Sequence, residues 1–137
     1  MLIPTVEYCL VCEDVRPEPF GKMSILGFYG QTPSVNIKIK DVGGTIKILF
    51  VLGMKAKEAG KYEFTAALYD PNKQELGQVG VVVEITSPVQ QQVLAVGFVL
   101  PVQVLGTYAF KLHMGSKRAY QTTLQIMHAA PADFNLN

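Results

Sequence analysis

Nine short runs of alternating apolar and polar residues, separated by Gly, Pro and Asp turns, extend from one end of the chain to the other. Successive side chains of a β-strand point to opposite faces, so a period of two residues predicts half-buried strands. The clearest run is 35–40, where Val and Ile alternate with Asn and Lys. Nine runs at spacings of about ten residues favour a sandwich or barrel over alternating β-α-β units. The sequence therefore predicts an all-β fold.

Two of the runs open with the same five-residue pattern. The two segments are Gly60-Lys61-Tyr62-Glu63-Phe64 and Gly106-Thr107-Tyr108-Ala109-Phe110. Residues two apart on a strand share a face, so each segment places its Tyr and its Phe on the same side. We expect both aromatic pairs in the hydrophobic core.

Length and charge narrow the class of protein. The 137 residues fit one domain, 1–137, in which 129–137 is an irregular tail. Lys and Arg number 12 against 11 Asp and Glu, with no long block of either sign, so we expect no nucleic-acid partner. The N-terminal residues lack the basic and long apolar segments of a secretory signal, so a cytoplasmic location is expected.

A stretch without charges, 85–110, raises the question of a membrane segment. Its most apolar part, 93–100, is far shorter than the ~20 residues that a spanning helix needs, and it runs into Pro101. We therefore expect no membrane span.

The same stretch contains a strand, 91–100, that is apolar on both faces. The larger residues on one face are Leu94, Val96, Phe98 and Leu100, and the smaller residues on the other are Val93, Ala95, Gly97 and Val99. A strand with one solvated side alternates apolar and polar residues, so either both sides are covered within the domain or the second face meets another chain. We expect the small face to form an interface between copies of this chain.

Two resemblances extend the fold prediction. The Gly-x-Tyr entry at Gly106, the short hairpin and the last alternating strand resemble the closing strands of immunoglobulin-like sandwiches, with Phe110 where antibody domains carry a disulfide Cys. This resemblance implies an immunoglobulin-like, two-sheet antiparallel sandwich of about eight to nine strands.

The opening of the chain resembles a family of small bacterial proteins of unknown function. Those proteins read Cys-Asp-Asp-Val-Arg, then Gly-Lys-x-Ser, then Gly-x-Tyr. Here the matching segments begin at Cys12, Gly21 and Gly27, and Glu13 replaces the first Asp. The resemblance implies a bacterial source and an all-β domain, and it brings no catalytic residues.

Metal and catalytic patterns are weak. Cys9 and Cys12 have the spacing of a metal or redox pair, but residues three apart on a strand face opposite sides, so we predict two ordinary half-buried thiols without metal. His113 and His128 lie near strand ends, and no activated nucleophile accompanies them. We expect no cofactor and no enzymatic activity.

One alternative concerns carboxylates in the loops. Glu13, Asp14 and Glu18 lie close together in sequence and Asp70 lies in another turn, so one end of a sandwich could hold Ca²⁺, which binds six to eight oxygens. Arg16 and Lys22 are interleaved with the first three. The sequence thus favours a self-associating binding or adaptor module, with a ligand- or calcium-binding, and even enzymatic, domain as the alternative.

Overall fold

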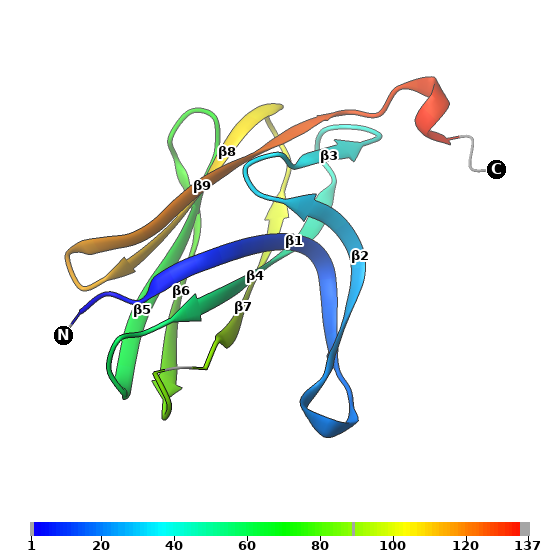
Figure 1. The fold of residues 1–137 in the computed structure, drawn as a ribbon. Helices are drawn as coiled ribbons and strands as arrows, with labels where there is room; N and C mark the ends of the chain where they lie inside the picture. Colours follow the sequence, from blue (N-terminus) through cyan, green and yellow to red (C-terminus); the bar gives the residue numbers. More distant parts are fainter. Residues whose placement is uncertain (1, 89, 135–137) are drawn as a thin grey trace.

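The computed structural model describes residues 2–88 and 90–134, which form a two-layer β-sandwich (Figure 1). The predicted all-β sandwich and its nine strands are confirmed within this part of the chain. The strands are β1 (Thr5–Pro17), β2 (Met23–Gln31), β3 (Asn36–Ile39), β4 (Thr45–Lys55), β5 (Gly60–Tyr69), β6 (Glu75–Ile85), β7 (Gln92–Pro101), β8 (Gly106–Met114) and β9 (Lys117–His128).

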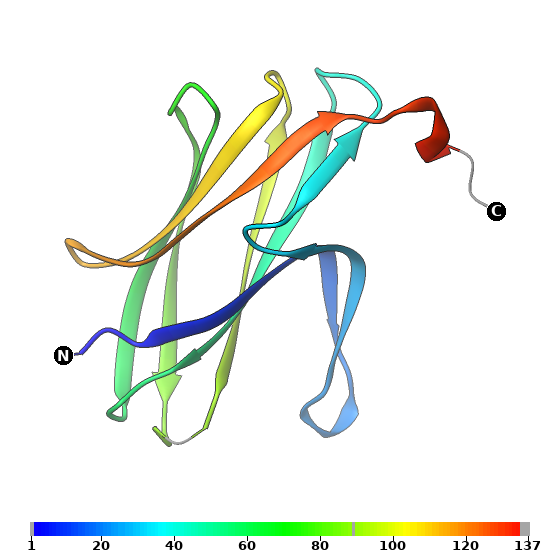
Figure 2. The same ribbon diagram turned by 45° about the horizontal axis from the view of Figure 1, so that its top comes forward.

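The strands divide into two sheets. Sheet A has the order β2-β1-β4-β7, and sheet B has the order β3-β9-β8-β5-β6. The expectation of a wholly antiparallel sandwich is wrong at one edge, because β3 runs parallel to β9 and pairs Asn36 with Gln125 (Figure 2). The Gly43-Gly44 turn connects β3 of sheet B to β4 of sheet A.

The core lies between the two inner faces, as the alternation predicts. On β7 the larger residues Leu94 and Phe98 point inward and are buried, as are their neighbours on the same face. Phe50 of sheet A stacks on Phe110 of sheet B with ring centroids 4.2 Å apart, and Phe98 meets both rings edge-on. The stack joins the sheets at the centre of the core, where aromatic pairs add to the energy of burial.

The repeated five-residue pattern forms the same structure twice. The Tyr62 hydroxyl donates to the carbonyl oxygen of Glu58, and the Tyr108 hydroxyl donates to that of Val104, each at 2.5 Å and four residues upstream. Both tyrosine rings are buried, so these hydrogen bonds give each hydroxyl a partner that it would otherwise lack. Each tyrosine fixes a crossing from sheet A to sheet B, β4 to β5 and β7 to β8.

The β1–β2 hairpin projects from the body of the sandwich in both ribbon views (Figures 1 and 2). Its tip is a short 3-10 turn, η1 (Pro19–Gly21), in which Phe20 has φ 65° and is 98% exposed. A bulky residue is rarely found in this left-handed conformation, because its Cβ crowds the following carbonyl. The exposed tip is therefore strained.

The C-terminal segment was expected to be irregular, and this is only partly correct. A 3-10 turn, η2 (Pro131–Phe134), follows β9, and Asp133 pairs with Lys38 of β3 at 2.8 Å. The last three residues of the predicted tail, 135–137, lie outside the described residues.

Candidate functional site

An apolar surface covers the side of sheet A that faces away from the core. We call it the outer face of sheet A and define it by residues of all four strands. These residues are Phe28 of β2, Tyr8, Leu10 and Cys12 of β1, Leu49, Val51 and Gly53 of β4, and Val93, Ala95, Gly97 and Val99 of β7.

The strand register aligns these residues in rows across the sheet. The first row is Tyr8, Gly53 and Val93; the second is Leu10, Val51 and Ala95; and the third is Phe28, Cys12, Leu49 and Gly97. The second row ends at Gln31 on β2. Beyond the third row, Lys47 lies opposite Val99. The centre of the face is thus apolar from β1 to β7.

Two glycines allow large neighbours to lie across the sheet. A Cβ placed on Gly53 would fall 2.1 Å from the ring of Tyr8, and one on Gly97 would fall 3.1 Å from Leu49 Cδ1. Tyr8 and Leu49 therefore lie over adjacent strands instead of standing up from them. The surface therefore has little relief around Gly53 and Gly97.

The face has a buried centre and exposed margins. Cys12, Leu49 and Val51 form a small cluster of buried side chains, against which Leu10 and Ile25 pack. At the margins, Val93 is 48% exposed, Val99 is 70% exposed and Phe28 is 58% exposed. Of the two explanations for the doubly apolar strand, coverage within the domain is wrong, because the small face of β7 is exposed throughout.

The charges beside the face are arranged in pairs of opposite sign. Lys47 Nζ lies 3.3 Å from Asp14 Oδ1, and Lys55 Nζ lies 3.8 Å from Glu7 Oε2. The pKa of Asp14 is lowered by the hydrogen bond from the Val15 backbone N–H and by Lys47. Neither end of the apolar surface therefore carries excess charge from these pairs.

The two cysteines lie on opposite sides of β1, as their spacing predicts. Cys9 belongs to the main core and Cys12 to the outer cluster. The expectation that they are half-buried is wrong, because both are buried, and both are free thiols. Burial raises the pKa of Cys9 to about 12 and also raises that of Cys12, so neither is poised as a nucleophile.

The candidate calcium ligands are not brought together. Glu18, in the turn between β1 and β2, pairs with Arg16, and Asp14 of β1 pairs with Lys47 of β4. Asp70 accepts hydrogen bonds from the backbone of its own turn. That turn lies at the end of the sandwich away from the tip of the β1–β2 hairpin (Figure 1). Residues 2–88 and 90–134 contain no group of three or more His, Cys, Asp or Glu placed to hold a metal ion.

The two histidines are also separated. His113 pairs with Arg118 near the start of β9, and His128 ends that strand, where it pairs with Ile39. Ten residues of extended chain span about 33 Å, so adjacent strands do not make a histidine pair here.

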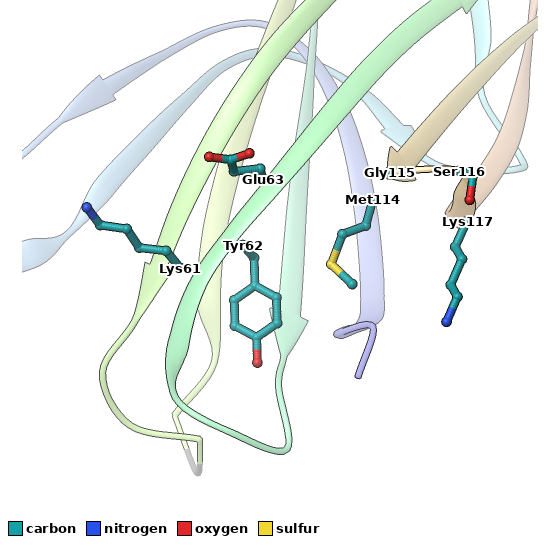
Figure 3. Close-up of a pocket in the computed structure, with 7 residues that line it drawn as sticks. All are labelled: Lys61, Tyr62, Glu63, Met114, Gly115, Ser116 and Lys117. Atoms are coloured by element: carbon teal, nitrogen blue, oxygen red, sulfur yellow. The ribbon is translucent and has the colours of Figure 1, made fainter. Parts of the chain in front are cut away.

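A hollow of about 470 Å³ lies on sheet B between the start of β5 and the β8–β9 turn. Figure 3 shows Lys61, Glu63 and Lys117 at its margin, with Tyr62 and Met114 beside them. The Tyr62 hydroxyl is already bonded to Glu58, and burial raises its pKa. Ser116 of the β8–β9 turn also lines the hollow, next to Lys117.

The fold and the face define a class: a two-sheet β-sandwich with one apolar sheet face exposed to solvent. The chain belongs to a family of unknown function, DUF6941, which it matches over residues 7–127. No helix in the described part of the chain is both long and apolar enough to cross a membrane.

Comparisons with other proteins add distant likenesses. No curated protein matches the sequence. The chain is similar to a β-glucosidase from Listeria innocua in complex with isofagomine, at 12% identity and a TM-score of 0.39, covering 91% of this chain and 17% of that one. It is also similar to the Pseudomonas fluorescens alkylpurine DNA glycosylase AlkC bound to DNA containing an abasic site analog, at 14% identity and a TM-score of 0.37. This match covers 72% of this chain and 28% of that one. The chain spans less than a third of either protein.

Proposed function

We propose that this protein is a non-enzymatic binding module that self-associates through the outer face of sheet A. The observation that carries the proposal is an apolar surface continuous over four strands, with its β7 margin exposed. Large exposed apolar patches mark interaction sites, because water disfavours them on a monomer. The occupant is a second copy of this chain.

The size of the face favours a reversible pair. From Val93 to Val99, β7 spans about 20 Å and four strands span about 19 Å, which gives a projected apolar area on the order of 400 Å². The centre of the face is already buried within the monomer, so the accessible apolar surface lies mainly at the margins. A standard interface buries about 800 Å² on each partner, so this face is the size of a small, weakly held interface.

The charges favour a like partner. Because Lys47 is paired with Asp14 and Lys55 with Glu7, two copies of the face can approach without a block of like charge on either side. A strongly basic or acidic partner would find no complementary charge in these pairs.

The proposal keeps the cytoplasmic location and bacterial source that the sequence indicates. Two buried free thiols, Cys9 and Cys12, suit a reducing compartment. The immunoglobulin-like character of β8 and β9 is part of the same proposal, supported by the Tyr108 bond to Val104 and by Phe110 stacked between the sheets.

The test places two lysines on the β7 margin. Val93→Lys with Val99→Lys should weaken self-association by about 100-fold or more, because assembly would bury unpaired ammonium groups. The control is Val82→Lys, since Val82 is 60% exposed on the outer side of sheet B. Sedimentation equilibrium over nanomolar to high micromolar concentrations measures both.

Three outcomes bear on the proposal. It is supported by a wild type and a Val82→Lys variant that associate alike while the double variant stays monomeric with an unchanged circular dichroism spectrum. A wild type that is monomeric at high micromolar concentration overturns it. A folded double variant that associates as the wild type does also overturns it.

A further inference from the structure

The geometry points to a specific arrangement: two copies pair face to face about a two-fold axis parallel to the strands of sheet A, so that Phe28 of each copy packs over Gly97 of the other. This inference rests on the self-association proposed above. It follows from how large and small side chains are distributed over the outer face of sheet A.

The face is asymmetric across its strands. Its β2 margin carries Phe28, which is more than half exposed, opposite the buried Cys12 of β1. In the middle of its β7 margin, between the exposed Val93 and Val99, lie Ala95 and Gly97, and the Leu49 side chain leans toward Gly97. In the third row the β2 margin is therefore raised and the β7 margin is low.

Symmetry limits how such a face can meet its copy. In a two-fold dimer the same surface serves both partners, so the face must complement itself. A two-fold axis that lies in the interface and runs perpendicular to the strands would place β2 on β2 and β7 on β7. The two raised margins would then meet each other. An axis parallel to the strands reverses their order and places β2 of one copy on β7 of the other.

The register sharpens this second arrangement. Rotation about an axis parallel to the strands leaves each row at the same height along them. Phe28 and Gly97 are the two ends of the third row, so the rotation brings each to face the other on the partner. Cys12 and Leu49, the middle of that row, face each other in the same way. Aligned sheets pack with a rotation of about 30°, which displaces the ends of each row more than its middle.

The arrangement predicts that a small and a large residue can be exchanged between the margins. Gly97 is unsuitable for enlargement because its own Leu49 occupies the space, so the exposed Ala95 in the adjacent row is used. Phe28→Ala removes the raised side chain, and Ala95→Phe fills the low margin. Each variant alone should dimerise about tenfold or more weakly than the wild type, since an aromatic contact between the two margins is lost or blocked.

Mixing the two single variants provides the decisive measurement. In the mixed dimer the Phe28→Ala margin faces the Ala95→Phe margin, and the native Phe28 faces the native Ala95 margin. The mixture should therefore form heterodimers at least about tenfold tighter than either homodimer, measured by native mass spectrometry with one variant isotopically labelled. Circular dichroism and thermal unfolding establish whether each variant is folded. If either variant is unfolded, the milder substitutions Phe28→Leu and Ala95→Leu are used in place of Phe28→Ala and Ala95→Phe.

The outcomes separate this geometry from the proposed function. Preferred heterodimers support it. If the wild type dimerises and the Val93→Lys, Val99→Lys variant does not, but mixing gives only statistical amounts of heterodimer, the axis is wrong while self-association through this face stands. A monomeric wild type overturns both.

Discussion

The outer faces of the two sheets differ in polarity: the outer face of sheet B is polar and that of sheet A is apolar. On sheet B the outward positions carry polar residues such as Thr107 and Gln125, which hydrogen-bond each other at 2.5 Å. Lys111 lies 4.7 Å above the ring of Tyr69. On sheet A the corresponding positions carry the apolar rows described above. Both sheets bury an inner face, so the two sheets differ in their outer faces, of which one is polar and the other is the apolar face proposed for binding.

The difference can be traced to the strands themselves. Strand β8 alternates buried Tyr108, Phe110 and Leu112 with outward residues that are polar or small. Strand β4 has an unbroken buried run from Ile48 to Met54. A strand with one wet side needs only every second residue apolar, so the extra apolar positions of β4 serve the outer face.

The largest expected effect compares the inner and outer faces of the sandwich. Phe110→Ala should lower the free energy of unfolding by about 3–5 kcal/mol, because it empties the centre of the aromatic stack. Phe28→Ala, measured in the monomeric Val93→Lys, Val99→Lys background, should change it by less than about 0.5 kcal/mol, as exposed side chains do. Urea unfolding measures both. A loss above 1 kcal/mol for Phe28→Ala would mean that it supports the monomer's own core.

Much of the fold could be predicted because alternation acts locally. The two faces of β7 were assigned correctly from the period alone, and so were the buried Tyr62 and Tyr108. The parallel pairing of β3 with β9 could not be predicted, because strand partners are set by long-range packing that a Gly-Gly turn does not reveal. The tyrosine hydrogen bonds to Glu58 and Val104 likewise required coordinates.

The candidate site was only half predicted. The small face of β7 was found from its missing alternation, and the same reasoning applied to Ile48–Leu52 would have identified β4 as part of the surface. The grouping of Glu13, Asp14 and Glu18 with Asp70 failed for a different reason. Two turns that are far apart in sequence need not lie at the same end of a sandwich, and Arg16 and Lys47 pair with Glu18 and Asp14.

The second prediction compares the two crossings that join sheet A to sheet B. Tyr62→Phe and Tyr108→Phe each remove one buried hydroxyl and leave a backbone carbonyl without its donor. Each should lower the free energy of unfolding by about 1–1.5 kcal/mol, and the two losses should be similar. Thermal and urea unfolding measure them. The equivalence of the crossings would be refuted by a loss at one site and none at the other.

The third prediction concerns the hairpin that extends sheet A. Phe20→Gly should raise the free energy of unfolding by roughly 0.5 kcal/mol, because relief of the left-handed conformation exceeds the added freedom of glycine in the unfolded chain. Phe20→Ala is the matched control, since it removes the ring and keeps the strain, and it should have little effect. Destabilisation by both variants would show that the ring contacts the body of the protein.

The smallest expected effect lies in the charges beside the outer face of sheet A. The pKa of Asp14 is lowered in the folded protein, first by the Val15 backbone N–H and then by Lys47. Folding therefore favours the ionised form of Asp14. Its contribution to the stability of the folded protein is present at neutral pH and is lost as the pH falls through the lowered pKa. Because the pair is exposed, Asp14→Asn should differ from wild type only slightly at neutral pH and low salt, and not at all in 1 M salt or in strong acid. Urea unfolding under each condition measures the free energy of unfolding, with the exposed Asp41→Asn as control. If Asp14→Asn lowered this free energy equally at every pH and salt concentration, the carboxylate would act through packing instead of charge.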